Sequence, residues 1–285
     1  MKIIVLGANG QLGWEYSKFL NNKVELFTFS HSELDILNFK EVIRKFEEIT
    51  PDVVINCAAY TKVDQAEENK HLAYQINTIG AKNVSFAAFK VRAKVVYFST
   101  DYVFDGIKKL SYNEFDKPNP ISVYGKSKLL GEVYTRKHNP NNLILRISWL
   151  YGIHGSNFVK NIIKLAKEKG KLKVVNDQVG TPTYTLDVVR QTWQLIQDDS
   201  VGLYHCSNTG QTNWFEFAKK IIEQINLNRR VLPIKTDELP VLAKRPSFSV
   251  LENYLLEIEN KNIMRSWEEA FNDFVNKYKK ELLNK

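Results

Sequence analysis

A glycine-rich turn near the start of the chain places the strongest constraint on its fold. The apolar run Lys2-Ile-Ile-Val-Leu6 is followed by glycines at positions 7, 10 and 13. The run is typical of a buried parallel strand, and residues 11–20 are typical of a helix. Glycines at such a joint permit a tight turn and a close approach of the backbone to a pyrophosphate, whose charge the helix N-terminus attracts. This pattern favours nucleotide binding over a structural glycine turn.

Strands and helices alternate through the first half of the chain, which predicts a doubly wound parallel α/β sheet, a Rossmann fold. Beyond residue 150, proline-containing stretches interrupt the pattern. We therefore predict a dinucleotide-binding domain with the catalytic residues over 1–150. A smaller C-terminal α/β lobe, mainly for the substrate, is predicted over 151–285, with room for some segments to return to the large sheet. The expected strands cover 24–29, 51–57, 95–99 and 142–149, and the expected helices cover 38–49, 72–90 and 124–138.

The composition favours a cytoplasmic enzyme. Hydrophobic residues make up 44% of the 285 residues, and no apolar stretch approaches the ~20 residues of a membrane span. A strand begins at once, which leaves no room for a signal peptide. Cys57 and Cys206 lie far apart in apolar contexts, so we expect two buried thiols. The net charge of +8 comes from lysines spread along helices, so we expect neither a nucleic-acid polymer nor a membrane as partner.

Tyr124 and Lys128 form a candidate catalytic pair. They lie four residues apart in an expected helix, which places both side chains on one face. An ammonium group beside a phenol favours the phenolate, so we expect Lys128 to lower the Tyr124 pKa toward neutral pH. Because the chain has 13 tyrosines, chance alone could supply one such pair. An exposed helical pair therefore stays the alternative until the surroundings decide.

Thr100 adds a hydroxyl at the expected carboxyl end of a strand. Ligands of an open parallel sheet bind at this edge, so Thr100 is placed for chemistry. Its hydroxyl could donate to a substrate carbonyl oxygen that becomes negative during reduction. The alternative is a Ser-Thr-Asp turn whose side chains satisfy the local backbone. The presence of Tyr124 downstream favours the catalytic interpretation.

The second strand bears on the choice of cofactor. An acidic residue at its end would bind ribose hydroxyls and repel a 2′-phosphate. Here no carboxylate occurs until Glu33, and Ser30 and His31 could donate hydrogen bonds to a phosphate. The sequence therefore predicts NADPH as the cofactor, with NADH as the alternative.

The glycine turn, the Tyr-x-x-x-Lys pair and the upstream threonine together resemble the extended short-chain dehydrogenase/reductase superfamily. Longer strings narrow the resemblance to the dTDP-4-dehydrorhamnose reductase family, over essentially the whole chain. The most specific strings are Ser99-Thr-Asp-Tyr-Val-Phe104 and Asp177-Gln-Val-Gly-Thr-Pro-Thr183, and Gly7-Ala-Asn-Gly-Gln-Leu-Gly-Trp-Glu15 also matches.

This resemblance implies an NADPH-dependent oxidoreductase that reduces the C4 ketone of dTDP-4-dehydro-L-rhamnose to dTDP-L-rhamnose. That reaction is the last step of dTDP-rhamnose synthesis for cell-surface polysaccharide. Tyr124 would protonate the oxyanion, Lys128 would hold the nicotinamide ribose, and Thr100 would polarise the carbonyl. Two alternatives stay open. One is a related sugar-nucleotide 4-ketoreductase or epimerase, such as an enzyme forming dTDP-6-deoxy-L-talose, and the other is a non-enzymatic nucleotide-binding regulatory subunit.

The resemblance also implies two sets of binding residues. Trp149, at the end of a strand, would pack its ring on the sugar, with an ordinary core tryptophan as the alternative. Asn157, Gln178 and Arg245 would contact the sugar hydroxyls and the diphosphate, with loop caps and surface ion pairs as the alternatives. The predicted cofactor-binding residues are Gly7, Asn9, Gly10, Gln11, Leu12, Ser30, Asp35, Ile36, Ala58, Ala59, Tyr60, Thr61, Tyr124 and Lys128. The predicted substrate-binding residues are Thr100, Asp101, Tyr102, Trp149, Asn157, Gln178 and Arg245.

Some members of the family dimerise through a divalent metal held by acidic residues. Glu15 is retained here, but Leu186 stands where a carboxylate is expected. We therefore predict no metal site, and either a monomer or a homodimer. Phe248 stands where the family commonly has a smaller polar residue, so contacts beside Arg245 are expected to differ.

Overall fold

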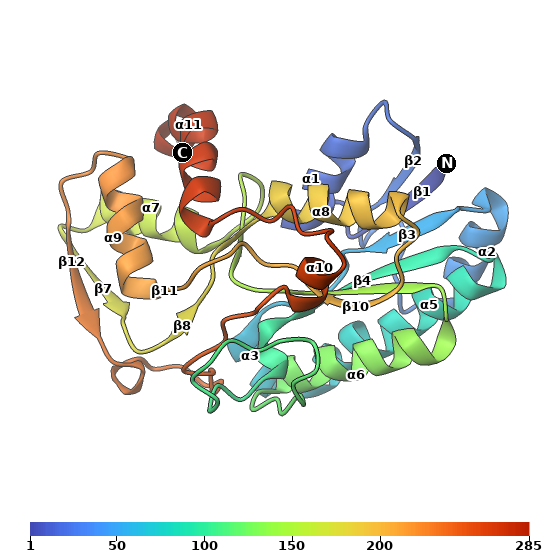
Figure 1. Ribbon diagram of the computed structural model, residues 1–285, viewed down its shortest axis with the longest axis horizontal. Coiled ribbons are helices and arrows are strands. Elements are labelled where there is room, and N and C mark those ends of the chain that lie inside the picture. Colours follow the sequence, from blue (N-terminus) through green and yellow to red (C-terminus); the bar gives the residue numbers. More distant parts are fainter. Residues whose placement is uncertain (285) are drawn as a thin grey trace.

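Six parallel strands form the central sheet of the computed structural model, which describes residues 1–284 (Figure 1). The strand order β10-β5-β4-β3-β1-β2 reverses direction at β1, and ligands of such sheets bind at the carboxyl ends beside this point. The predicted doubly wound parallel sheet is therefore confirmed. Its strands are β1 (Lys2–Leu6), β2 (Glu25–Phe29), β3 (Val53–Asn56), β4 (Lys94–Thr100), β5 (Asn142–Ile147) and β10 (Gly202–His205).

Helices cover both faces of this sheet (Figure 1). Helices α1 (Gln11–Leu20) and α8 (Thr185–Gln197) pack on each other over one face. Helices α2 (Phe39–Ile49), α5 (Ala81–Lys90) and α6 (Val123–His138) lie over the other. Apolar side chains of the strands and of the helices above and below them bury one another, so the sheet is covered on both sides as parallel sheets require.

The predicted helix over residues 72–90 contains a change of hydrogen-bonding pattern. Helix α4 (Lys70–Tyr74) continues into a π-helical segment, Gln75–Gly80, and then into α5. The π segment turns Asn77 into the protein, where its side chain is 1% exposed. Such segments often occur at functional sites.

A smaller lobe lies beside the sheet and has an aromatic core (Figure 1). Tyr151, Phe217, Phe271 and Phe274 pack there in tilted and edge-on contacts. Its helices are α7 (Phe158–Glu168), α9 (Trp214–Gln224) and α11 (Trp267–Asn284). Three strand pairs complete it: β6 (Leu150–Tyr151) with β9 (Thr183–Tyr184), β7 (Lys171–Val175) with β12 (Arg230–Ile234), and β8 (Val179–Gly180) with β11 (Thr212–Asn213).

The chain returns to the large sheet after residue 150, as the prediction allowed. Strand β10 pairs with β5 in parallel, and α8 packs on α1. The remaining short elements lie in the connections between these strands and helices. They are α3 (Val63–Glu68), the 3₁₀ turns η2 (Asp101–Val103) and η3 (Thr236–Glu238), and α10 (Tyr254–Ile258).

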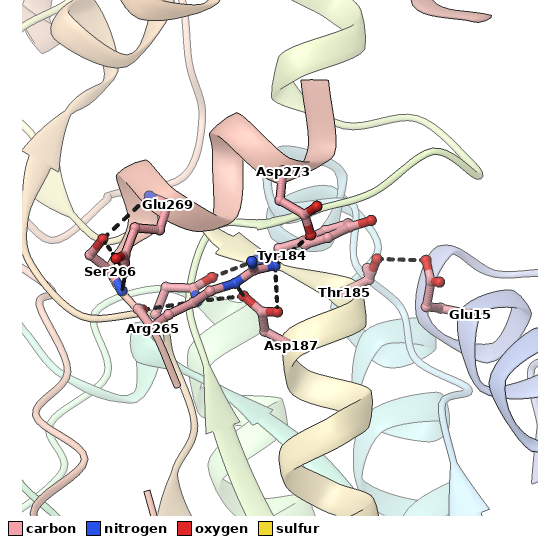
Figure 2. Close-up of polar contacts among 9 residues, drawn as sticks. Glu15, Tyr184, Thr185, Asp187, Arg265, Ser266, Glu269 and Asp273 are labelled. Carbon is pink, nitrogen blue, oxygen red and sulfur yellow. Dashed lines mark hydrogen bonds and ion pairs between the residues drawn. The ribbon is translucent and has the colours of Figure 1, made fainter. Parts of the chain in front are cut away.

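Arg265 ties the C-terminal helix to the rest of the molecule (Figure 2). Its guanidinium donates to both carboxylate oxygens of Asp187 at 3.0 Å and to Asp273 in α11 at 2.8 Å. Asn208 donates a further hydrogen bond to Asp187. Because Asp187 belongs to α8, this ion-pair network joins the small lobe to a helix that covers the large sheet.

Neither cysteine forms a disulfide. Cys57 and Cys206 are both free, and burial raises the pKa of each thiol. Both thiols are free, as predicted, but only Cys206 is fully buried, whereas Cys57 is partly buried. Among the helices of residues 1–284, none combines the length and the apolar character that crossing a membrane requires.

Candidate active site

The glycine turn after β1 has the shape that a dinucleotide phosphate requires. Gly7 has a φ of +69°, and a side chain there would come within 2.8 Å of the Ala58 backbone nitrogen. A Cβ at Gly13 would overlap the carbonyl oxygen of Gly7. Gly10 is the N-cap of α1 and offers no side chain to the first-turn N–H groups. These free donors and the helix dipole suit a pyrophosphate, so the residues present fit a dinucleotide.

Residues from the small lobe hold this turn in place. His154 Nε2 lies 3.0 Å from the carbonyl oxygen of Asn9, and Gln11 donates to the carbonyl oxygen of Leu150 at 3.1 Å. The Asn157 amide donates to the Gln11 side-chain oxygen at 2.7 Å and also caps α7. Asn157, predicted to bind substrate, therefore has the capping role of the alternative interpretation and contacts the cofactor turn.

The end of β2 differs from the prediction. Glu33 folds back onto Ser30, and its Oε2 accepts hydrogen bonds from both the backbone nitrogen and the hydroxyl of Ser30 at 2.7 Å. These bonds lower the pKa of Glu33. A carboxylate therefore does lie at the end of the second strand, because the turn brings residue 33 beside residue 30. The side chain of His31 is 84% exposed and can reach solvent-side groups.

Residues 35–36 and 58–61 lie along the same edge of the sheet. Asp35 accepts from the backbone of Leu37 at 2.9 Å, and Asn38, not Asp35, caps α2. Ile36 is buried against Gly80, where a side chain would overlap it. The segment after β3 is fixed by Asn77, whose side chain bonds both the N–H and the C=O of Tyr60. Of the four predicted residues there, Ala58 touches the glycine turn, and Ala59, Tyr60 and Thr61 follow it.

Thr100 and Tyr124 meet at the carboxyl end of β4. Thr100 is the last residue of that strand, and its hydroxyl lies close enough to the Tyr124 phenol to lower the pKa of that phenol. Ser122 caps α6 by accepting from the Gly125 N–H at 3.1 Å. A side chain at Gly125 would overlap the carbonyl oxygen of Tyr102, so this glycine lets α6 approach the catalytic turn closely. The structure thus brings together two hydroxyls that the sequence separates.

The electrostatics of the pair contradict one expectation. Burial raises the pKa of Tyr124 to about 12; Thr100 lowers it in part and Asp101 raises it. Burial lowers the pKa of Lys128 to about 7, although the nearby Glu132 and Cys57 raise it in part. Lys128 Nζ lies 4.2 Å from the centre of the Tyr97 ring and does not act on the Tyr124 pKa. The predicted lowering is therefore wrong. A phenol with this pKa keeps its proton at neutral pH, which is the form that donates.

Asp101 is a buried carboxyl group beside the two hydroxyls. Its two oxygens accept from Thr100 at 3.0 Å and from Ser249 at 2.6 Å. Burial raises the pKa of Asp101 to about 7, although both hydrogen bonds lower it. Ser249 belongs to the segment after Arg245, so this bond connects the catalytic turn to the C-terminal part of the chain.

Arg245 has a partner that the sequence did not predict. Its guanidinium donates to both oxygens of Asp64 in α3, at 3.1 and 2.6 Å, and both Asp64 and Tyr102 raise the pKa of Arg245. Tyr102 in turn contacts Tyr124 edge-on, with 5.9 Å between ring centres. Arg245 therefore stands beside the catalytic turn, and Asp64 occupies the bidentate face that was predicted to contact the diphosphate.

Trp149 and Gln178 lie together at a second part of the site. Trp149 follows β5, two residues after Ile147, which is paired with Thr100. Gln178 is 4% exposed; its oxygen accepts from Trp214 at 3.2 Å, and its amide donates to Thr236 at 2.9 Å. Trp214, which stacks on Trp149, was not predicted.

The comparisons with known proteins cover nearly the whole chain. The family described as RmlD substrate binding domain matches residues 1–280. The chain belongs to this family. The match confirms the resemblance inferred from the sequence motifs.

Relatives of this chain include dTDP-4-dehydrorhamnose reductases and a polysaccharide biosynthesis protein. A dTDP-4-dehydrorhamnose reductase of Aggregatibacter actinomycetemcomitans is 39% identical over 268 residues, which is 88% of this chain and 90% of the relative. The spore coat polysaccharide biosynthesis protein SpsK of Bacillus subtilis is 39% identical over 275 residues, 96% of both chains. A dTDP-4-dehydrorhamnose reductase of Bacillus anthracis, crystallised in complex with NADP, is 45% identical with a TM-score of 0.95, covering 97% of this chain and 99% of that one.

A buried ion pair between Glu132 and Arg146 lies next to the catalytic residues. Glu132 and Arg146 are 0% and 3% exposed, and the guanidinium donates to both carboxylate oxygens at 2.9 and 2.8 Å. Ser99, next to Thr100, also donates to Glu132. Glu132 follows Lys128 by four residues on the helix face that begins with Tyr124. This spacing was a signal that could have identified it from the sequence.

Glu15 and the acidic residue next to Leu186 both have protein partners here. Glu15 accepts a hydrogen bond from Thr185 at 2.9 Å, while Asp187 binds Arg265 (Figure 2). Leu186 is a buried apolar residue. Within the part of the chain that the structure describes, no group of three or more His, Cys, Asp or Glu side chains could hold a metal ion.

Proposed function

We propose that this chain reduces the C4 ketone of dTDP-4-dehydro-L-rhamnose to dTDP-L-rhamnose, with NADPH as the hydride donor, in the cytoplasm. The observation that carries the proposal is the approach of the Thr100 and Tyr124 hydroxyls at the carboxyl edge of the sheet, in a chain of the RmlD family. Residues 1–150 would hold the nucleotide cofactor, and the small lobe would hold most of the sugar nucleotide. The names of the relatives support the substrate, and the NADP complex of the B. anthracis relative supports the cofactor.

Each residue of the site has a separate role in the reduction. A bound nicotinamide nucleotide supplies the hydride. Thr100 donates a hydrogen bond to the C4 oxygen and stabilises its developing negative charge. Tyr124, which holds its proton at neutral pH, transfers that proton to the oxyanion. Lys128 holds the ribose.

The decisive test is to identify the product. Purified protein, NADPH and dTDP-4-dehydro-L-rhamnose are mixed, NADPH consumption is followed, and the product is assigned by NMR. We expect dTDP-L-rhamnose. Formation of the C4 epimer would assign the chain to the talose-forming branch, and an absence of NADPH consumption would contradict the reductase proposal altogether.

The cofactor choice is testable at Ser30 and Glu33. Glu33→Gln removes the carboxylate at the end of β2, so we expect the ratio of kcat/KM for NADPH over NADH to rise by about fivefold, the order of repulsion between two close like charges in water. Ser30→Asp adds a carboxylate and should shift the ratio toward NADH.

The control for this pair is Glu47→Gln, which makes the same change of charge at an exposed position of α2. It should leave the cofactor ratio unchanged. A wild-type kcat/KM that is already higher for NADH than for NADPH would contradict the NADPH proposal.

A further inference from the structure

Two indole rings from distant parts of the chain lie face to face at the sheet edge. Trp149 follows β5, and Trp214 is the first residue of α9 in the small lobe. Their ring centres are 3.4 Å apart and their planes differ by 7°. Trp214 also contacts Phe158 with ring centres 4.4 Å apart, and its N–H donates to Gln178.

The overlap of these rings is not the arrangement that aromatic pairs prefer. Both faces of an indole carry partial negative charge, so such rings favour offset or edge-on contacts with centres about 4.5–7 Å apart. The Trp149–Trp214 pair lies below this range and is nearly parallel. A ligand with positively polarised C–H groups, placed between the two rings, would remove the repulsion between their faces.

Trp149 is held in a conformation that needs support from its surroundings. Its φ is +42°, in the left-handed region that bulky residues rarely adopt. Gly180 lies against the indole so closely that a side chain there would overlap the ring. Gly180, in the loop of residues 177–183, therefore contacts the indole of Trp149 in addition to Trp214. A ligand reaches the indole face that Trp214 covers only by separating the two rings.

We propose that Trp214 is a substrate-binding residue that forms, with Trp149, a two-sided aromatic clamp on the pyranose ring. The inference rests on the proposed function and extends it. Ile147, two residues before Trp149, pairs with Thr100, so the indole stands at the edge where the reacting carbonyl is polarised. The faces of a 6-deoxy sugar present C–H groups that suit the negative face of an indole.

Entry of the sugar requires the two planes to move apart. Van der Waals contact on both faces of a ring needs about 3.5–4 Å on each side, so the separation must roughly double. Trp214 follows β11, which pairs with β8 in the loop of residues 177–183. A shift of this strand pair with the small lobe would therefore move Trp214 and Gln178 together, because the two side chains are hydrogen-bonded.

The clamp has a spectroscopic signature. Two stacked indoles give an exciton couplet in the circular dichroism spectrum, and this couplet falls when the rings separate. Titration of the full chain with dTDP-L-rhamnose should reduce the couplet, whereas dTDP, which lacks the sugar, should leave it intact. Trp214→Phe should abolish it, and Trp193→Phe, outside the pair on α8, should keep it. A couplet that is unchanged at saturating dTDP-L-rhamnose would overturn the clamp.

Kinetics supply the second readout. Trp214→Ala should raise the KM for the sugar nucleotide by about tenfold, the effect of losing one aromatic contact, and leave the Kd for NADPH unchanged. Trp214→Phe, which keeps a ring, should retain part of the wild-type affinity, and Trp193→Phe should behave as wild type. A wild-type KM in Trp214→Ala would overturn the clamp.

These outcomes separate the clamp from the proposed function. If the wild-type chain turns over the sugar nucleotide while the couplet stays intact, the clamp alone is wrong. If dTDP-L-rhamnose reduces the couplet but NADPH is never consumed, the reductase proposal is wrong and the clamp stands.

Discussion

Replacing Tyr124 with phenylalanine should lower kcat by at least about 100-fold, the usual contribution of a positioned general acid. The substitution keeps the ring that meets Tyr102 edge-on and removes only the hydroxyl whose pKa Thr100 lowers. Packing at the start of α6 is therefore retained, and the Kd for NADPH should change little. Stopped-flow or steady-state oxidation of NADPH with dTDP-4-dehydro-L-rhamnose measures kcat, and fluorescence titration measures the cofactor affinity.

The matched control is Tyr134→Phe, on the same helix, where the ring stacks on His138 away from Thr100. It should retain wild-type kcat. A Tyr124→Phe enzyme with a tenth or more of the wild-type turnover would contradict the assignment of Tyr124 as the proton donor.

The largest expected loss of stability is at Glu132. Glu132→Ala leaves the Arg146 guanidinium buried without its bidentate partner, and breaking a buried pair in this way typically costs about 3–5 kcal/mol of unfolding free energy. His205, whose Nε2 lies 3.4 Å from Arg146 Nη1, cannot compensate, because an imidazole supplies no negative charge. Urea denaturation followed by far-UV circular dichroism gives the free energy of unfolding.

Two controls test that reasoning. Glu48→Ala removes an exposed partner of Arg44 on α2 and should leave the denaturation midpoint nearly unchanged. The double variant Glu132→Met with Arg146→Met removes both charges and should recover much of the lost stability, because no buried charge is left unpaired. A single Glu132→Ala variant as stable as wild type would show that the pair does not stabilise the fold.

The sequence predicted best those features whose signals are local. The α1 boundaries, Gln11–Leu20, match the expected helix because an uncapped glycine turn begins it and an apolar face continues it. The expected helix over 72–90 was found, but its π segment was not, because a one-residue shift in hydrogen bonding leaves no mark on hydrophobic spacing. Thr100 could be placed at the carboxyl edge of a parallel sheet from its strand, and the family resemblance associated Tyr124 with it.

What the sequence could not predict depends on pairs that only the folded chain brings together. Asp64 and Arg245, or Trp149 and Trp214, are separated by long stretches of chain, and neither residue of a pair identifies the other. The Tyr124 pKa was mispredicted for a related reason: spacing showed that Lys128 was near, but not that burial of the phenol would outweigh any nearby charge.

The parallel pairing of β10 with β5 also determines when this protein can fold during its synthesis. Residues 202–205, which form β10, leave the ribosome long after β5. Until then, one edge of β5 has no partner strand in the nascent chain, and this edge contains the apolar residues Leu143, Ile144 and Leu145. Open edges of this kind recruit strands from other chains. A fragment cut at residue 150 would keep that edge permanently. Expression of the nucleotide-binding half alone is therefore expected to give aggregates, and a permuted gene that encodes β10 earlier should shorten the vulnerable interval.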